Sequence, residues 1–258
     1  YRKWSNKHHR RLLTNAELYF ASASNFNDPF DSNITINYSK GSKKEILGKY
    51  VEHIAKKNPG LSKTDRLKLA KSWMEKGIYN DPENIIKSQK SQIEKRLKEV
   101  GIVSLSEYSD DIIMWSHYAD SHKGFCVGFD TNNLQRFKEQ YKQLHEVLFN
   151  IYKVKYNKKY PTPSPFGTEE EVVIDPLRIK SYIWNYGNEY RLISLNGSNQ
   201  ILQLTDEIIS EVILGCQMAE PDIEDIIRVL SKLRKPIRLY KMEMKTAEFG
   251  LSKKEIAY

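Results

Sequence analysis

A glutamate and an arginine lie two residues apart in the segment WNYGNEYRLI, residues 184–193. From Glu189 onward the segment alternates in polarity, as a strand does, so Glu189 and Arg191 are expected on one face. A guanidinium beside a carboxylate favours its ionised form, the form that stabilises positive charge developing in a reaction. The alternative is an exposed ion pair of little consequence.

A second group of polar residues lies in the segment MWSHYADSHKGFCVGFD, residues 114–130. Between two apolar stretches it carries Ser116, His117, Tyr118, Asp120, His122 and Lys123. On a continuous helix His117 and His122 would lie about 140° apart, so a metal pair on one helix is not expected. His117 and Asp120 would share a face, which suits a histidine whose tautomer is fixed by a carboxylate. The alternative is a helix cap and polar turn in which Trp115 and Tyr118 are core residues.

The third group lies near the start of the sequence. Its members are Arg2 and Lys3 beside Trp4, then Ser22, Ser24, Asn27 and Asp28. Residues 18–24 have the pattern of a short strand, and Asn27-Asp28-Pro29 is first of all a turn. This group therefore indicates function only together with the other two.

The elements that must position these residues are short strands and one helical block. Residues 101–130 read as strand, helix and strand, and residues 33–38, 189–195, 200–204 and 237–244 as further strands. Residues 43–99 show helical spacing, with breaks at Asn58-Pro59-Gly60 and Asp81-Pro82 that predict three helices. We therefore expect an α+β fold: a single domain, residues 1–258, with one mixed, mainly antiparallel sheet and residues 43–99 as a helical insertion.

The amino-acid composition limits the expected cellular location and binding partners of the protein. The formal net charge of +8 favours a nucleotide, another anionic small molecule or a nucleic acid as partner, although lysines often cover the solvated faces of helices. No apolar run is long enough to cross a membrane, and the basic start YRKWSNKHHRR lacks the apolar part of a signal peptide. Cys126 and Cys216 each lie in an apolar stretch. We expect a cytoplasmic protein with no disulfide, no metal site and no membrane partner.

Together, and in this order, the three groups resemble a family of uncharacterised bacterial proteins. The matching residues are Lys3-Trp4, Phe26 to Asp31, Met114 to Asp130, Trp184 with Glu189 to Arg191, and Val212 to Gly215. The resemblance carries no settled activity. It implies a setting in bacterial stress or antiphage defence.

A second resemblance, to ADP-ribosyltransferases, implies a mechanism. These enzymes use a basic residue on an early strand, a Ser-x-Ser strand and a late glutamate, often as Glu-x-Glu, which stabilises the oxocarbenium-like state of NAD cleavage. Arg2 or Lys3, Ser22 with Ser24, and Glu189 would fill these roles, with NAD as substrate. His117, Tyr118, His122 and Lys123 would shape the pocket. Further contacts to the substrate would come from Asn27, Asp28, Trp115 and Arg191. Gly187 replaces the first glutamate of Glu-x-Glu, which puts transfer to arginine in doubt.

Two other hypotheses remain open. In the first, a metal-independent RNase or other phosphodiesterase uses His117 and His122 as general base and acid, with Lys123 stabilising the phosphorane. In the second, the protein is a non-catalytic module, and the basic helices of residues 43–99 bind a nucleic acid or a protein.

Overall fold

The computed structural model describes residues 1–33, 42–76, 95–144, 149–163 and 170–258. These residues form two compact units. The first contains Tyr1–Ala23, Glu99–Val154 and Tyr182–Tyr258, and the second contains Ser24–Lys98 and Lys155–Ser181. Nearly all of the predicted helical insertion belongs to the second unit, and the expectation of one domain stays a prediction.

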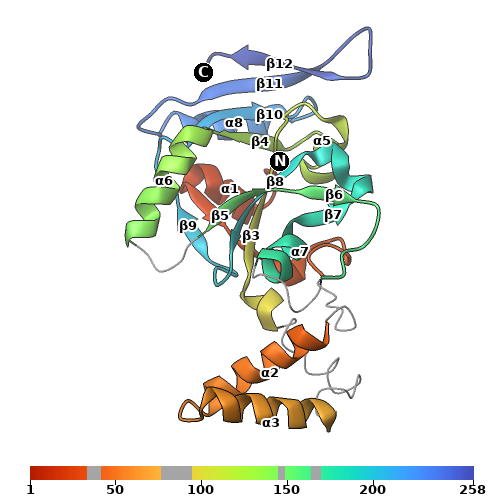
Figure 1. The fold of residues 1–258 in the computed structure, drawn as a ribbon. Coiled ribbons are helices and arrows are strands. Elements are labelled where there is room, and N and C mark those ends of the chain that lie inside the picture. Colours follow the sequence, from red (N-terminus) through yellow and green to blue (C-terminus); the bar gives the residue numbers. More distant parts are fainter. Residues whose placement is uncertain (34–41, 77–94, 145–148, 164–169) are drawn as a thin grey trace. The chain divides into compact units, whose positions relative to one another are not determined.

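The first unit contains two four-stranded sheets. One has the order β12-β11-β10-β4 and is built from β4 (Phe125–Phe129), β10 (Ile209–Leu214), β11 (Arg238–Met244) and β12 (Leu251–Ile256) (Figure 1). Only β10 and β11 pair in parallel, and α8 (Glu220–Leu230) connects them, as a parallel pair requires a crossover. The other pairs in this sheet are antiparallel.

The second sheet carries the glutamate and arginine noted above. Its order is β2-β3-β8-β5, all antiparallel, with β2 (Ala21–Ser22), β3 (Gly101–Ser106), β5 (Asn150–Lys153) and β8 (Glu189–Ser194). A separate antiparallel pair joins β1 (Glu17–Tyr19) to β9 (Ile201–Gln203). The α+β class and the mainly antiparallel pairing are thus confirmed, but the strands divide among several sheets.

An apolar core holds the first unit together. Helices α1 (Lys7–Thr14), α6 (Thr131–Leu144) and α8 contribute buried side chains such as Leu13, Leu134 and Ile226, which pack with strand residues such as Val103 and Leu192. A smaller cluster surrounds Trp115 on α5 (Ile112–Tyr118). Asp111 caps α5 by accepting a hydrogen bond from the backbone N–H of Met114, as its position before the apolar run predicts.

The second unit contains a helical hairpin and a strand pair. In the hairpin, α2 (Lys43–Lys57) and α3 (Lys63–Glu75) bury Tyr50, Ile54 and Ala70 between them (Figure 1). The parallel pair joins β6 (Lys155–Asn157) to β7 (Ile179–Ser181), and the π-helical turn η3 (Glu170–Ile174) and α7 (Asp175–Arg178) precede β7. Two of the three predicted helices are confirmed. Most of the third, and all but Asn33 of the predicted strand 33–38, lie outside the described residues, although residues 95–99 are helical.

The predicted strand over residues 18–24 is wrong as a single element. It divides at Phe20, whose buried ring belongs to the core, because β1 pairs with β9 and β2 with β3. Residues Ala23–Asn25 then form the 3₁₀ turn η1. Ser24 consequently lies on a turn and not on a strand.

Candidate functional site

A buried ion pair lies on β8 of the first unit. Glu189 begins β8, and its Oε1 accepts hydrogen bonds from Arg191 Nε at 2.6 Å and from Ser104 Oγ at 2.7 Å. The side chain of Arg191 is 0% exposed and that of Glu189 is 9% exposed. The expected shared face is confirmed, and the alternative of an exposed pair is wrong. We call Glu189, Arg191 and Ser104 the Glu189 cluster.

Strand register explains why Ser104 joins this cluster. In the antiparallel pairing of β3 with β8, Ser104 lies opposite Arg191 and Ser106 lies opposite Glu189. Residues directly opposite each other project from the same face of a sheet, so all four side chains share one face. Ser106 Oγ donates to the carbonyl of Gly187 at 2.8 Å and so fixes the turn that precedes Glu189. Ser104-Leu105-Ser106 is therefore a Ser-x-Ser strand beside Glu189, and sequence reasoning missed it.

Ser22 lies elsewhere on the same sheet. It pairs with Gly101, which is one of the odd-numbered residues of β3, whereas Glu189 pairs with Ser106. The two side chains consequently project from opposite faces, and five residues of strand, about 17 Å, separate their partners. A shared pocket for Ser22 and Glu189 is thus excluded by register.

The remaining residues predicted at the N-terminal turn belong to the second unit. Ser24 and Asn27 are exposed there, and Asp28 is buried. Asp28 Oδ1 accepts a hydrogen bond from the backbone N–H of Phe30 at 2.9 Å. That bond to the second residue along is typical of an Asx turn, so the predicted turn is confirmed.

Trp115 was a predicted substrate contact, and this prediction is wrong. Its side chain is 0% exposed, its Nε1 donates to the carbonyl of Ser109 at 2.8 Å, and its ring meets that of Tyr1 edge to face at 5.3 Å between centroids. Tyr118 is half-buried and contacts the ring of His117. Trp115 is therefore a core residue that anchors α5, which was the alternative interpretation.

The proposed partnership of His117 with Asp120 is also wrong. Helix α5 ends at Tyr118, and Asp120 has a φ of 54°, so the helical geometry that would stack these two residues stops before Asp120. Asp120 instead contacts Lys3 Nζ at 3.7 Å and accepts a hydrogen bond from Ser5 Oγ at 3.4 Å. His117 is exposed. Lys3 accordingly ties the N-terminal segment to the turn after α5.

His122 closes that turn. Asp120, Ser121 and His122 all have positive φ, a left-handed run that side chains other than glycine adopt at a cost. His122 Nε2 lies 3.0 Å from Ser116 Oγ, and its Nδ1 is buried without a hydrogen-bond partner among the described residues. Lys123 is exposed. Since both nitrogens of His122 face the protein, this geometry does not favour a two-histidine nuclease.

Arg2 joins the N-terminal segment to β4. Its backbone pairs with that of Phe125 in an antiparallel bridge, with N–O distances of 2.7 and 2.9 Å, and its Nη1 donates to the carbonyl of Tyr1. Burial lowers the pKa of the Arg2 guanidinium. Burial, and then the charge of Arg2, lower the pKa of His9 to about 4, and His9 Nδ1 accepts the backbone N–H of Lys3. Binding of phosphates by Arg2 or Lys3 stays a prediction.

An open groove of about 500 Å³ lies in the first unit, and its lining includes Asn188, the residue before Glu189 in the sequence. It is lined by Tyr108, Asp110, Asp111, Ile112, Ile113, Tyr186, Asn188, Phe249 and Gly250. Asn188 directly precedes Glu189, and its carbonyl accepts the backbone N–H of Glu107. The groove therefore includes the residue next to Glu189 in sequence, although no member of the Glu189 cluster lines it, and it has the size of a small-molecule site.

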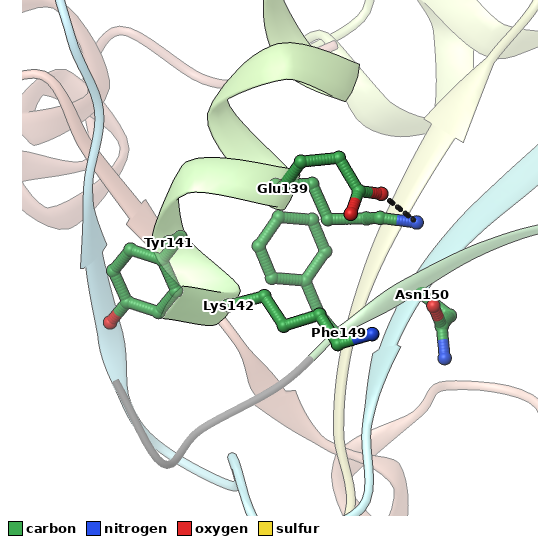
Figure 2. A pocket seen from close by; sticks show the side chains of 6 residues that line it. Glu139, Tyr141, Lys142, Phe149 and Asn150 are labelled. Carbon is green, nitrogen blue, oxygen red and sulfur yellow. Dashed lines mark ion pairs between the residues drawn. The ribbon is translucent and has the colours of Figure 1, made fainter. Parts of the chain in front are cut away.

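A second hollow lies between α6 and β5. Figure 2 shows its lining residues, among them Phe149, Tyr141 and the Lys138–Glu139 ion pair at 3.3 Å. Its volume is only about 80 Å³, well below what a nucleotide requires. Among the described residues, no group of three His, Cys, Asp or Glu side chains could hold a metal ion.

Comparison with known protein families gave a match to the part of the chain that contains both His117 and Glu189. Residues 114–192 match the family "Protein of unknown function (DUF2971)". The DUF2971 match begins at Met114 on α5 and ends on β8, so it includes His117, His122, Glu189 and Arg191. The resemblance to an uncharacterised family is thereby confirmed for this segment. Neither the curated proteins nor the solved structures gave a match.

Within the part of the chain that is described, no helix is both long and apolar enough to cross a membrane.

Proposed function

We propose that this protein cleaves the bond between nicotinamide and ribose in NAD, as an ADP-ribosyltransferase-like enzyme or another NAD-consuming effector, with Glu189 as its catalytic carboxylate. One observation carries the proposal: Arg191 Nε and Ser104 Oγ both bind Glu189 Oε1, within 2.7 Å, on a regular sheet. A carboxylate held in this way is oriented before any substrate arrives.

The chemistry requires such a group. When the C–N bond of NAD breaks, nicotinamide leaves with the bonding electrons as a neutral molecule, and positive charge develops on the ribose. A fixed carboxylate stabilises this oxocarbenium-like state more strongly than a mobile one does, because no reorganisation is needed. Water, or a side chain of a target protein, then attacks the ribose carbon and loses a proton.

The Ser-x-Ser feature of the transferase analogy is supplied by Ser104 and Ser106, in place of Ser22 and Ser24. Ser104 positions the carboxylate directly, and Ser106 fixes the turn at Gly187. The absence of a carboxylate at Gly187 favours hydrolysis, or transfer to an acceptor other than arginine. An enzyme that depletes NAD would suit the setting of stress or antiphage defence that the family resemblance implies.

The groove beside Asn188 supports the same proposal. It offers two tyrosines, Tyr108 and Tyr186, against which a nicotinamide or adenine ring could stack. Its volume of about 500 Å³ falls within the range of sites that hold molecules of this kind.

The first test is binding and turnover with the intact chain. Millimolar NAD should raise the melting temperature, since a ligand of the folded state stabilises it. Chromatography of the reaction should show nicotinamide and ADP-ribose in equal amounts if water is the acceptor. If NAD neither shifts the melting temperature nor yields nicotinamide, the proposed function is wrong.

A further inference from the structure

We propose that the α2–α3 hairpin is a binding surface for nucleic acid, recognised through its phosphodiester backbone. The first supporting observation is the distribution of positive charge along the chain. Residues 42–76 contain ten Lys and Arg residues and four Asp and Glu residues, a formal excess of six in a chain whose net charge is +8. Three quarters of the net charge is thus concentrated on one helical hairpin.

The lysines of this hairpin are available to a partner. Eight are exposed, and none forms an ion pair with another described residue: Lys43, Lys44, Lys56, Lys57, Lys63, Lys68, Lys71 and Lys76. In other parts of the described chain, lysines such as Lys153, Lys155 and Lys253 do pair with carboxylates. The hairpin therefore keeps its positive field.

Two of its four acidic residues are committed to holding the helices. Glu45 and Ser42 form a reciprocal capping box at the start of α2. Ser62 caps α3 by accepting the backbone N–H of Asp65, and its hydroxyl lies 2.7 Å from the Asp65 carboxylate. These two carboxylates lie at the first turns of the helices, whereas Glu52 and Glu75 lie further along α2 and α3. The formal excess of six positive charges already counts all four carboxylates.

The size of the surface suits a nucleic acid. A helix of 15 residues is about 22 Å long. Along that length a duplex presents roughly 13 phosphates, at one charge per 1.7 Å of axis. The hairpin can thus contact several phosphates at once.

The same helices are poorly suited to an anionic membrane, the other polyanionic surface. A membrane-bound helix exposes an apolar face to the lipid. Here the apolar face is buried between α2 and α3, where Tyr50, Ile54 and Ala70 pack. Among the described hairpin residues, Leu67, at 40%, is the one large apolar side chain classed as exposed. The charge pattern therefore favours phosphodiesters over lipid.

The test measures binding of fluorescein-labelled 20-base-pair duplex RNA, 20-base-pair duplex DNA and a 20-nucleotide single-stranded RNA by anisotropy. The test variant changes Lys44, Lys57, Lys68 and Lys71 to Gln, which keeps helix propensity and removes four charges. The matched control changes Lys7, Lys142, Lys232 and Lys235 of the first unit to Gln. Both variants carry the same net charge, and circular dichroism checks that both are folded.

We expect at least one of the three probes to bind the wild type with strongly salt-dependent affinity. The hairpin variant should bind that probe at least about tenfold more weakly at 50 mM salt, and its salt slope should fall by up to about 3.6, since each phosphate contact contributes about 0.9. The control variant should stay within about threefold of the wild type, and the three probes identify the kind of nucleic acid.

Equal weakening in both variants would overturn the proposal, because it would indicate net charge alone. Failure of all three probes to bind would also overturn the proposal, as would binding to phosphatidylserine vesicles and to none of the three probes. The inference does not rest on the NAD proposal. Nicotinamide release can fail while the hairpin binds nucleic acid, and the reverse also holds.

Discussion

At the scale of single residues, the Glu189 cluster depends on the hydrogen bond from Ser104. A hydrogen bond to a charged group contributes about 1.5–3 kcal/mol, part of which would act on the orientation of the carboxylate. We therefore predict that Ser104→Ala lowers kcat for nicotinamide release at least about tenfold with little change in KM, as expected for an interaction that matters in the transition state.

The matched control is Ser210→Ala. Ser210 also lies on a strand of the first unit, and its Oγ donates to the carbonyl of Gly128 at 3.1 Å. Steady-state kinetics give kcat and KM for nicotinamide release by both variants. If the two lose the same activity, Ser104 has only a structural role.

His9 provides a prediction about pH. Its pKa in the folded protein is about 4, because burial and the charge of Arg2 disfavour the imidazolium, whereas the unfolded chain takes up the proton near pH 6.5. The unfolded state therefore binds more protons between pH 6.5 and 4, and the free energy of unfolding falls as the pH falls through this window. Since His9 is only half-buried, solvent screening limits the effect to about 1 kcal/mol.

Urea denaturation at pH 7 and pH 5 measures this effect. His9→Gln should lessen the loss of stability between the two values, and His8→Gln, at an exposed neighbour, should not. An unchanged pH dependence in His9→Gln would show that His9 does not contribute.

The sequence allowed part of this residue-scale account to be predicted. Alternation along residues 189–194 is enough to place Glu189 and Arg191 on one face. Ser104 could not be assigned to them, because the register between β3 and β8 is a long-range property that no local pattern contains. The exposed or buried state of Trp115 was equally open, since a tryptophan beside polar residues suits both a core and a pocket.

At the scale of elements, Gly215 tests how closely the end of β10 packs against the turn at His122, and Gly48 on α2 serves as the control. A Cβ on Gly215 would lie 2.0 Å from the backbone oxygen of His122, and one on Gly48, in the exposed part of α2, would meet nothing within 4 Å. We predict that Gly215→Ala destabilises the protein by at least about 2 kcal/mol, because backbone must move. Gly48→Ala should stabilise it by about 0.5–1 kcal/mol through helix propensity.

Chemical denaturation measures the free energy of unfolding of both variants. A neutral Gly215→Ala would contradict the close approach of β10 to the turn at His122.

Local signals predicted most elements of the first unit but not their ends. A helix between the two strands of residues 101–130 was predicted, whereas its end at Tyr118 depends on the left-handed turn at residues 120–122. Strand β12 was missed because LSKKEI is largely polar, as suits a strand at the edge of the sheet.

At the scale of the whole molecule, two proposed tasks fall on two different parts of the chain. The first unit would hold NAD chemistry at the Glu189 cluster, and the lysine-rich hairpin of the second would hold a nucleic acid. Composition alone suggested an anionic partner, and the structure shows that the basic residues 42–76 form one helical hairpin. The division into units was not predictable, because the second unit combines residues 24–98 with residues 155–181, which are distant in sequence.

The most direct test of the central claim is the rate of nicotinamide release from NAD by Glu189→Gln compared with Glu211→Gln. Glu211 offers a matched ion pair in the other sheet, with Lys253 at 2.8 Å. If Glu189 is the catalytic carboxylate, Glu189→Gln should be at least about a hundredfold slower than the wild type while remaining folded, and Glu211→Gln should retain most of the activity. Full activity in a folded Glu189→Gln variant would contradict the account.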